Sequence, residues 1–321
     1  MAEDYTYIVA RVRAIEAAMP DVAWFQRLAR TSQTGLIATL REYYHGFETV
    51  DSLFEFEKGI EAEKVAVLNL ISNLIADPGT RIFLRGGDDC DNVLHTWKAQ
   101  KLGARPTLNP FGLLKGEVIE KAIASGDWEP LPEYCRDLLG ELETWGGMEA
   151  PPEAEYRGEA AKWRFLMSAA PDARAREFVR MKIDLMNIKT FVRLKRTSLR
   201  REALDLVWIA CGGIESARLA ALFREPEDEL YAFLEMTDYR GLVRLGLGKD
   251  IPLWRIDPLM RRHLLSILGE SRYRFFDISP VLYHLELWER DMQLLRSIIV
   301  GKLNRLPEEM IMERADTLLP S

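Results

Sequence analysis

The chain has 321 residues, of which 48% are hydrophobic and 29% are charged, and its formal net charge is −7. This balance is typical of a soluble globular protein and excludes a disordered or fibrous chain. The negative charge also argues against nucleic acid as the main partner, because a polyanion is bound by a basic surface.

Apolar residues recur along most of the chain at the spacing of amphipathic helices, whereas the alternation typical of strands is scarce. The first such stretch, "YTYIVARVRAIEAAM", follows an acidic start and lacks the basic segment of a secretory signal. The longest apolar run, Val65 to Ala76, is shorter than the ~20 residues that cross a bilayer. We therefore predict an all-α protein without a transmembrane segment of its own.

Three helical stretches share one polar pattern: "FLRGGDDCDNVLHTWKAQKLGAR" from Phe83, "FVRMKIDLMNIKTFVRLKRTSLR" from Phe178 and "HLELWERDMQLLRSIIVGKLNRL" from His284. Each has a charged residue, an opposite charge four positions later and a carboxamide three positions after that. Such positions lie on one face of a helix. The resulting triads are Arg85, Asp89 and Asn92; Arg180, Asp184 and Asn187; and Glu286, Arg290 and Gln293.

The repeated pattern predicts three related helical units, covering residues 1–106, 107–200 and 201–321 of one compact assembly. The N-terminal helix is expected to pack with the last unit. Because a period near one hundred residues is long for an open solenoid, the units are expected to close around a pseudo-threefold axis.

Two interpretations of the triads remain open. Arg180, Asp184 and Asn187 are expected to point into the apolar arc beside Phe191, where a charge is tolerated only if it is paired and hydrogen-bonded. The triads are then either structural pins that fix helix packing in each unit, or the polar lining of a cavity where the three units converge.

Basic residues form a second pattern on the helix that begins near Phe178. A stripe of cationic side chains runs along one edge of it, formed by Lys182, Lys189, Arg193 and Arg196. Long cationic side chains usually lie in water, so the stripe is expected to be the solvent face of a mostly buried helix. The same residues are candidate docking charges for an acidic partner.

Motifs for catalysis, cofactors or metals are missing from the sequence. The nearest approach to a phosphate-binding loop, "GLVRLGLGKD" from Gly241, lacks the required lysine and hydroxyl residue at their positions. The four histidines form no H-E-x-x-H motif, the three cysteines form no C-x-x-C pair, and no G-x-S-x-G elbow occurs. We predict no catalytic, cofactor-binding or metal-binding residues, and a protein that contacts other proteins in a reducing compartment.

Four segments together resemble a known family: "YTYIVARVRAIEAAM", "MKIDLMNIKTFVRLK", "GGIESARLAAL" and the ending "LELWERDMQLLRSIIVGKLNRLPEEMIMER". They resemble the C subunit of the bacterial and archaeal V/A-type rotary ATPases, which is similar to the d subunit of the eukaryotic V-ATPase. The resemblance extends over essentially the whole chain. The sequence departs from it at Gly86 and Gly87, which are expected to weaken the start of their helix.

The resemblance implies three similar helical units arranged as a funnel or cup. It implies a non-catalytic central-stalk subunit at the cytoplasmic face of the membrane, with no cofactor. Its partners would be the central-shaft subunits and the cytoplasmic loops of the membrane rotor ring, which it would couple for ion transport. A stand-alone helical scaffold or regulator, and a helical enzyme with an unrecognised motif, remain alternatives. The residues do not distinguish proton from sodium transport, or hydrolysis from synthesis.

Overall fold

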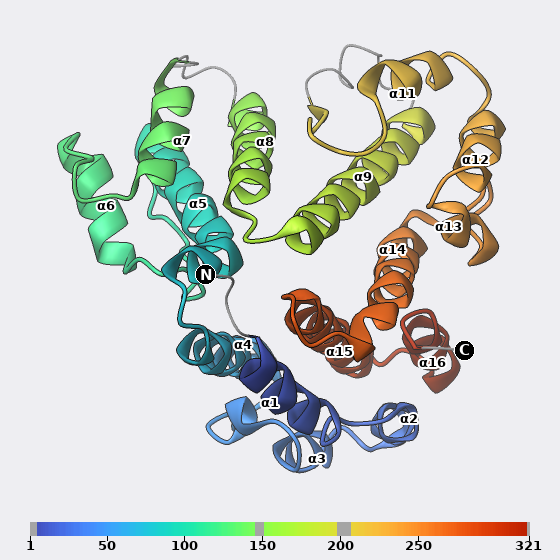
Figure 1. The fold of residues 1–321 in the computed structure, drawn as a ribbon. Coiled ribbons are helices and arrows are strands. Elements are labelled where there is room, and N and C mark those ends of the chain that lie inside the picture. The colour runs from blue at the N-terminus through green and yellow to red at the C-terminus, as the bar shows by residue number, and fades with distance from the viewer. Residues whose placement is uncertain (1–4, 145–150, 198–206, 320–321) are drawn as a thin grey trace. The chain divides into compact units, whose positions relative to one another are not determined.

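The computed structural model describes residues 5–144, 151–197 and 207–319 of the chain. Within these ranges all regular structure is α-helix or short 3-10 helix, and no strand occurs (Figure 1). The predicted all-α class is therefore confirmed. None of the helices in this part of the chain combines the length and the low charge that a bilayer-spanning segment requires.

The chain divides into two compact units, one made of Met1–Ala76 with Tyr231–Ser321 and the other of Asp77–Leu230. The three-unit division at residues 106 and 200 and the pseudo-threefold funnel or cup stay predictions. The first of these boundaries falls in a loop between two helices, and the second falls in residues 198–206, outside the described residues.

The first unit combines both ends of the chain. Its helices are α1 (Thr6–Glu16), α2 (Val22–Arg30), α3 (Leu36–Arg41), η1 (His45–Phe47), η2 (Leu53–Glu55), α4 (Phe56–Leu74), α13 (Arg240–Arg244), α14 (Leu253–Gly269), η3 (Glu270–Tyr273), α15 (Ser279–Leu303) and α16 (Glu308–Asp316). α1 contacts α15, and α2 contacts both α15 and α16. One core results, in which Trp24 and Leu28 of α2 pack with Leu295 and Ile299 of α15.

The second unit is built around a long central helix. Its helices are α5 (Pro78–Leu102), α6 (Gly116–Ser125), α7 (Glu133–Thr144), α8 (Pro151–Ala169), α9 (Ala173–Arg196) and α11 (Ser216–Leu222), and α12 (Glu227–Glu235) contains the boundary to the first unit. α5 contacts α6, α7 and α8, and Figure 1 shows these helices gathered around it. Val93 of α5, Ile119 of α6 and Leu139 of α7 are fully buried in their common core.

Aspartates begin three of the helices. The carboxylates of Asp21, Asp77 and Asp172 accept hydrogen bonds from backbone N–H groups in the first turns of α2, α5 and α9. Such N-caps satisfy donors that the helix itself leaves free. α5 ends at Gly103, whose φ of 62° lies in the left-handed region that favours glycine.

α5 continues without interruption through Gly86 and Gly87, where the sequence suggested a weakened helix. The reason is tertiary packing. A Cβ atom at Gly86 would lie only 2.8 Å from the Phe165 ring of α8. The glycine therefore lets α8 approach α5 closely, and the packing offsets a helix-propensity cost of ~1 kcal/mol per glycine.

Candidate functional site

The first triad holds the loop that connects α5 to α6. The side-chain amide of Asn92 donates to the carbonyl of Asn109 and accepts from its N–H group, both at 2.9 Å. Asp89 Oδ1 accepts from the N–H of Leu114, also at 2.9 Å. We call Asp89 and Asn92, together with the backbone of residues 109–114, the first latch.

Arg85 strengthens the first latch from one turn earlier on α5. Its guanidinium donates to the carbonyls of Phe111 at 2.7 Å and Gly112 at 2.8 Å. Only about 9% of Arg85 is exposed. The charged donors thus serve backbone acceptors inside the protein, where an unpaired carbonyl would carry a desolvation cost.

The second triad builds the same arrangement between α9 and α11. The Asn187 amide donates to the carbonyl of Ile209 at 2.8 Å and accepts from its N–H at 3.1 Å. The Asp184 carboxylate accepts from the N–H groups of Gly213 at 2.8 Å and Ile214 at 3.0 Å. Asp184 and Asn187, with the backbone of residues 209–214, form the second latch.

The two latches share one register. In each, the residue bound by the aspartate follows the residue bound by the asparagine by five positions, from 109 to 114 and from 209 to 214. The next helix begins two residues later, at Gly116 in α6 and at Ser216 in α11. Each latch therefore fixes where the following helix starts relative to the helix that carries the triad.

Two glycines allow the aspartates to approach the loops. A Cβ atom at Gly112 would overlap Oδ1 of Asp89, and one at Gly212 would overlap Oδ1 of Asp184. In both cases the distance from this Cβ to the carboxylate oxygen would be shorter than real Cβ contacts essentially ever are. Glycine is needed at these positions because of the close approach of a carboxylate.

Arg180 departs from the expectation for its triad. It was expected to point into the apolar arc with Asp184, but its side chain is exposed. The aliphatic part runs past the loop, with Cδ 3.3 Å from the position of a Cβ at Gly213. The second latch therefore depends on backbone donors rather than on a buried partner charge at this position.

The third triad joins two helices instead of holding a loop. Arg261 of α14 donates from Nη1 to Glu286 Oε2 at 2.8 Å and from Nε to Gln293 Oε1 at 3.1 Å. Arg290, the middle residue of the triad, donates to the neighbouring Asp291. The α15 triad thus has the same kinds of side chain as the other two, but it contacts a neighbouring helix instead of a loop.

Tyr134 supports the first latch through Asp89, and the sequence pattern did not reveal it. Its hydroxyl donates to Asp89 Oδ2 at 2.8 Å from α7. Burial raises the pKa of Asp89, and the hydrogen bonds from Leu114 and Tyr134 oppose that rise. Burial and the nearby Asp89 charge also raise the pKa of Tyr134. Tyr134 belongs to a different helix, so no helical spacing could have linked it to Asp89.

A partly buried cluster of charges between α5 and α8 was also missed. Lys162 lies 2.8 Å from Asp91 Oδ1 and 2.7 Å from Glu159 Oε2. Burial lowers the pKa of this lysine, but the two carboxylates outweigh that effect and raise it above the usual value. The only sequence signal is the i, i+3 spacing of Glu159 and Lys162, which is common on exposed helices.

Asp291 is the third group that sequence reasoning passed over. It is fully buried, and burial raises its pKa to about 6 despite the adjacent Arg290 guanidinium. Burial and the Asp291 charge in turn raise the pKa of Tyr44. An acidic residue one position after a triad residue offers no pattern that distinguishes it from a solvent-facing charge.

The four candidate docking charges on α9 have different surroundings. Arg193 is exposed, whereas Lys182 and Lys189 are partly buried, with the Lys182 ammonium 5.7 Å from the centre of the Phe178 ring. Arg196 does not belong to a free solvent stripe, because its guanidinium donates to Glu227 Oε1 at 2.8 and 2.9 Å. Its charge is paired with Glu227 within the second unit.

Comparisons with known proteins agree on one family. The family model described as "ATP synthase (C/AC39) subunit" matches residues 8–314. A protein of Desulfurococcus sp. (strain SY), named as the C subunit of an A-type ATP synthase, is 27% identical, over 97% of this chain and 90% of the relative. Proteins with the same name from Thermococcus gammatolerans and Thermococcus kodakarensis are 25% and 26% identical, over 92% and 96% of this chain and 85% and 89% of the relatives. Because the family model spans nearly the whole sequence, the chain belongs to the ATP synthase (C/AC39) subunit family.

Proposed function

We propose that this protein is a non-catalytic central-stalk subunit of a V/A-type rotary ATPase or ATP synthase. It couples the rotating central shaft to the membrane rotor ring and works as a peripheral subunit at the cytoplasmic face. The observation that carries the proposal is the family match over residues 8–314, together with relatives that are named C subunits of A-type ATP synthases.

The latches fit a mechanical role of this kind. A coupling subunit has to transmit torque without letting its helices slip past one another. Each latch fixes a helix to the loop that leads into the next helix by several hydrogen bonds to backbone groups that cannot rotate away. Buried charge-assisted hydrogen bonds are short and geometrically specific, so slippage would leave their donors and acceptors unsatisfied. This interpretation favours structural pins over the lining of a cavity.

Docking of the shaft or the ring is the second part of the proposal. Arg193 is the stripe residue most suited to it, because Arg193 is exposed and no described residue neutralises it in the way Glu227 neutralises Arg196. Lys189 lies one turn earlier on the same stripe and is partly buried. Complementary charges accelerate association and select partners more than they raise affinity. The acidic counterpart would lie on the shaft or on a loop of the ring.

Affinity purification of the tagged chain from its own organism, with the complex kept in mild detergent, tests the assignment. The shaft and ring subunits are expected to co-purify in fixed ratio. Complexes assembled without the chain should still hydrolyse ATP but should fail to acidify or load vesicles with ions. Restored pumping after adding back the chain would establish coupling.

A stand-alone scaffold predicts a different outcome. The tagged chain would then purify without shaft or ring subunits, and vesicle pumping would not depend on it. Either result contradicts the proposed function, because a coupling subunit must be physically present between the two rotating parts.

A further inference from the structure

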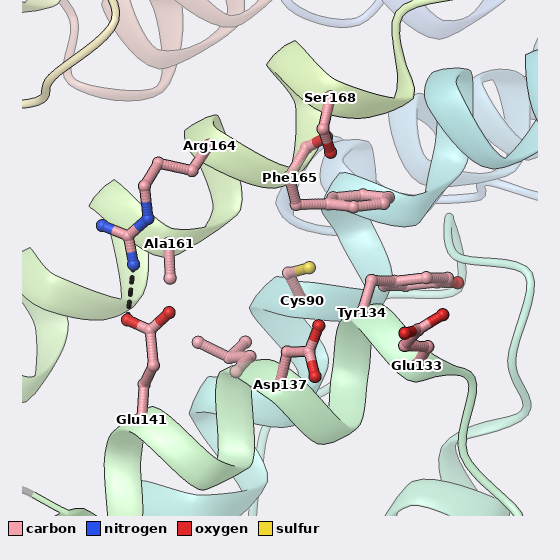
Figure 2. A pocket seen from close by; sticks show the side chains of 10 residues that line it. Cys90, Glu133, Tyr134, Asp137, Glu141, Ala161, Arg164, Phe165 and Ser168 are labelled. Carbon is pink, nitrogen blue, oxygen red and sulfur yellow. Dashed lines mark hydrogen bonds and ion pairs between the residues drawn. The ribbon is translucent and has the colours of Figure 1, made fainter.

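A groove of about 440 Å³ opens in the second unit between α7 and α8. Figure 2 shows Cys90 of α5 at its floor, with Tyr134 and Phe165 forming an aromatic wall. The groove belongs to neither the proposed docking stripe nor the loops held by the latches. Its size is sufficient for one long side chain or a small molecule.

The aromatic wall is fixed before any ligand arrives. The Tyr134 and Phe165 rings are stacked, with centroids 4.4 Å apart and an angle of 16° between their planes. Tyr134 is held by its hydrogen bond to Asp89, and Phe165 lies against Gly86. Because both rings are already ordered, a ligand that packs on them would not have to immobilise them.

The rim of the groove is acidic. Glu133, Asp137 and Glu141 recur every four residues on one face of α7. Glu141 pairs with Arg164 of α8 at 2.5 Å, which the dashed line in Figure 2 marks. No residue in the described part of the chain pairs with the carboxylates of Glu133 or Asp137, so two negative charges remain available beside the aromatic wall.

We propose that this groove binds a lysine or arginine side chain presented by a segment of a partner protein. The aliphatic stem would lie along Tyr134 and Phe165, and the cationic group would meet Glu133 and Asp137. Long basic side chains combine these two demands, because their stems pack on apolar surface while their ends stay charged. Charge complementarity selects a basic occupant and disfavours an acidic or a purely apolar one.

The inference deepens the proposed function, on which it rests in taking the partner to be another subunit of the rotary complex. The partner is then expected to carry an exposed basic segment. The acidic groove is a surface separate from the basic α9 stripe. The chain would thus contact basic and acidic partner surfaces at different places.

The test uses the full chain and a fluorescein-labelled alanine-based helical peptide with lysines along one face. Anisotropy titration at low salt measures its affinity. We expect E133Q/D137N to weaken binding about twofold to thirtyfold, the range that two exposed ion pairs supply. S168W should also weaken binding, because Ser168 is an exposed residue of the groove and the larger side chain fills it without changing any charge.

The matched control is E117Q/E120Q, which removes two exposed carboxylates from α6. The groove proposal is overturned if this control weakens peptide binding as much as E133Q/D137N, because the attraction would then be general. It is also overturned if S168W leaves the affinity unchanged, if the same peptide with acetylated lysines binds equally well, or if the unmodified chain does not bind the lysine peptide. Circular dichroism verifies that each variant is folded.

Co-purification separates this proposal from the proposed function. Wild-type chain that co-purifies with shaft and ring subunits but shows no groove-dependent peptide binding contradicts the groove and leaves the function intact. Groove-dependent binding by a chain that purifies without those subunits contradicts the function instead. If both proposals are correct, E133Q/D137N should lower retention of one partner subunit in the purified complex, and E117Q/E120Q should not.

Discussion

At the scale of single residues, the positions of the Asp89 and Asp184 carboxylates require a neighbouring residue without a side chain. Both carboxylates are fully buried, and both accept hydrogen bonds from backbone N–H groups of a loop. Each also lies where the Cβ of any residue other than glycine would be, at Gly112 and Gly212. The carboxylate and the glycine are therefore expected to be energetically coupled, so that the stability cost of changing one depends on whether the other is present.

Gly212→Ala is expected to lower the free energy of unfolding by about 1–3 kcal/mol, because the added methyl group overlaps Asp184 in a packed interior. Urea denaturation measures the change. The control is Gly140→Ala on α7, where no atom lies within 4 Å of the new methyl group. That control should be neutral or stabilising by up to ~1 kcal/mol.

A double-mutant cycle gives the decisive comparison. In an Asp184→Ala background the methyl group at position 212 meets no carboxylate, so Gly212→Ala should cost less than it does alone. Strictly additive effects of the two substitutions on the free energy of unfolding would contradict this coupling between Asp184 and Gly212.

Asp291 is the residue whose titration should be visible in the pH dependence of stability. Burial raises its pKa to about 6, whereas an unfolded aspartate titrates near ~3.9. The folded protein therefore binds this proton more tightly than the unfolded chain does. The contribution of Asp291 to stability is most favourable below about pH 4 and is lost as pH rises through about 6.

Asp291→Asn removes that titration. The stability of the wild type minus that of the variant should be larger at pH 4 than at pH 7 by about 2–3 kcal/mol, following from the shift to about 6. Urea unfolding across this pH range measures it. A difference that stays constant with pH, or that grows as pH rises, would contradict the assignment.

At the scale of elements, the same polar spacing is used in two ways. On α5 and α9 it holds a loop and thereby sets the start of the next helix. On α15 it meets Arg261 of α14, so that two long helices are joined directly. A polar row on a buried helix face needs partners, and the neighbouring element decides whether backbone or side chain supplies them.

Arg261→Met should therefore destabilise the contact between α14 and α15. It removes hydrogen bonds to Glu286 and Gln293, and Glu286 is only 5% exposed. We expect a loss of about 1–3 kcal/mol in the free energy of unfolding. Arg193→Met, at an exposed position, is the control and should change it by less than about 0.5 kcal/mol.

Glu286→Gln in the Arg261→Met background completes this test. With the arginine gone, neutralising the buried carboxylate should restore part of the lost stability, since it removes the cost of burying a charge without that partner. No recovery would mean that the Arg261 contact contributes through packing alone.

At the scale of the whole molecule, the proposed role requires surfaces that bind partners without catalysing a reaction. The α9 stripe predicts docking to an acidic partner. Lys189→Glu with Arg193→Glu should slow association with the isolated shaft subunits and reduce the salt dependence of binding, because complementary charge is replaced by repulsion. Surface plasmon resonance at several salt concentrations measures this effect.

Arg196→Gln serves as the comparison for that experiment. Its charge is already paired with Glu227, so its removal should affect stability more than docking. Unchanged association rate and salt dependence in the Lys189→Glu, Arg193→Glu variant would show that the stripe does not take part in docking.

The sequence alone predicted the helical class and the three polar rows, because both follow from the spacing of residues along the chain. It placed Asp89 and Asn92 on one face of their helix, and it placed Asp184 and Asn187 on one face of theirs, beside Phe191. It did not identify Tyr134, because nothing in the spacing within α5 points to a residue of α7. It also misplaced Arg180, since a helical projection gives directions around an axis but not the depth of the surrounding protein.

What only the tertiary structure decided is where the polar groups find their partners. The loop partners of Asn92 and Asn187 lie 17 and 22 positions away, and the loop partners of Asp89 and Asp184 lie 25 and 29 or 30 positions away. Helical periodicity relates only residues a few positions apart, so it could establish that these side chains need partners but not that a returning loop supplies them. The sequence determined the local conformation and the need for hydrogen bonds, and folding of distant segments determined how that need is met.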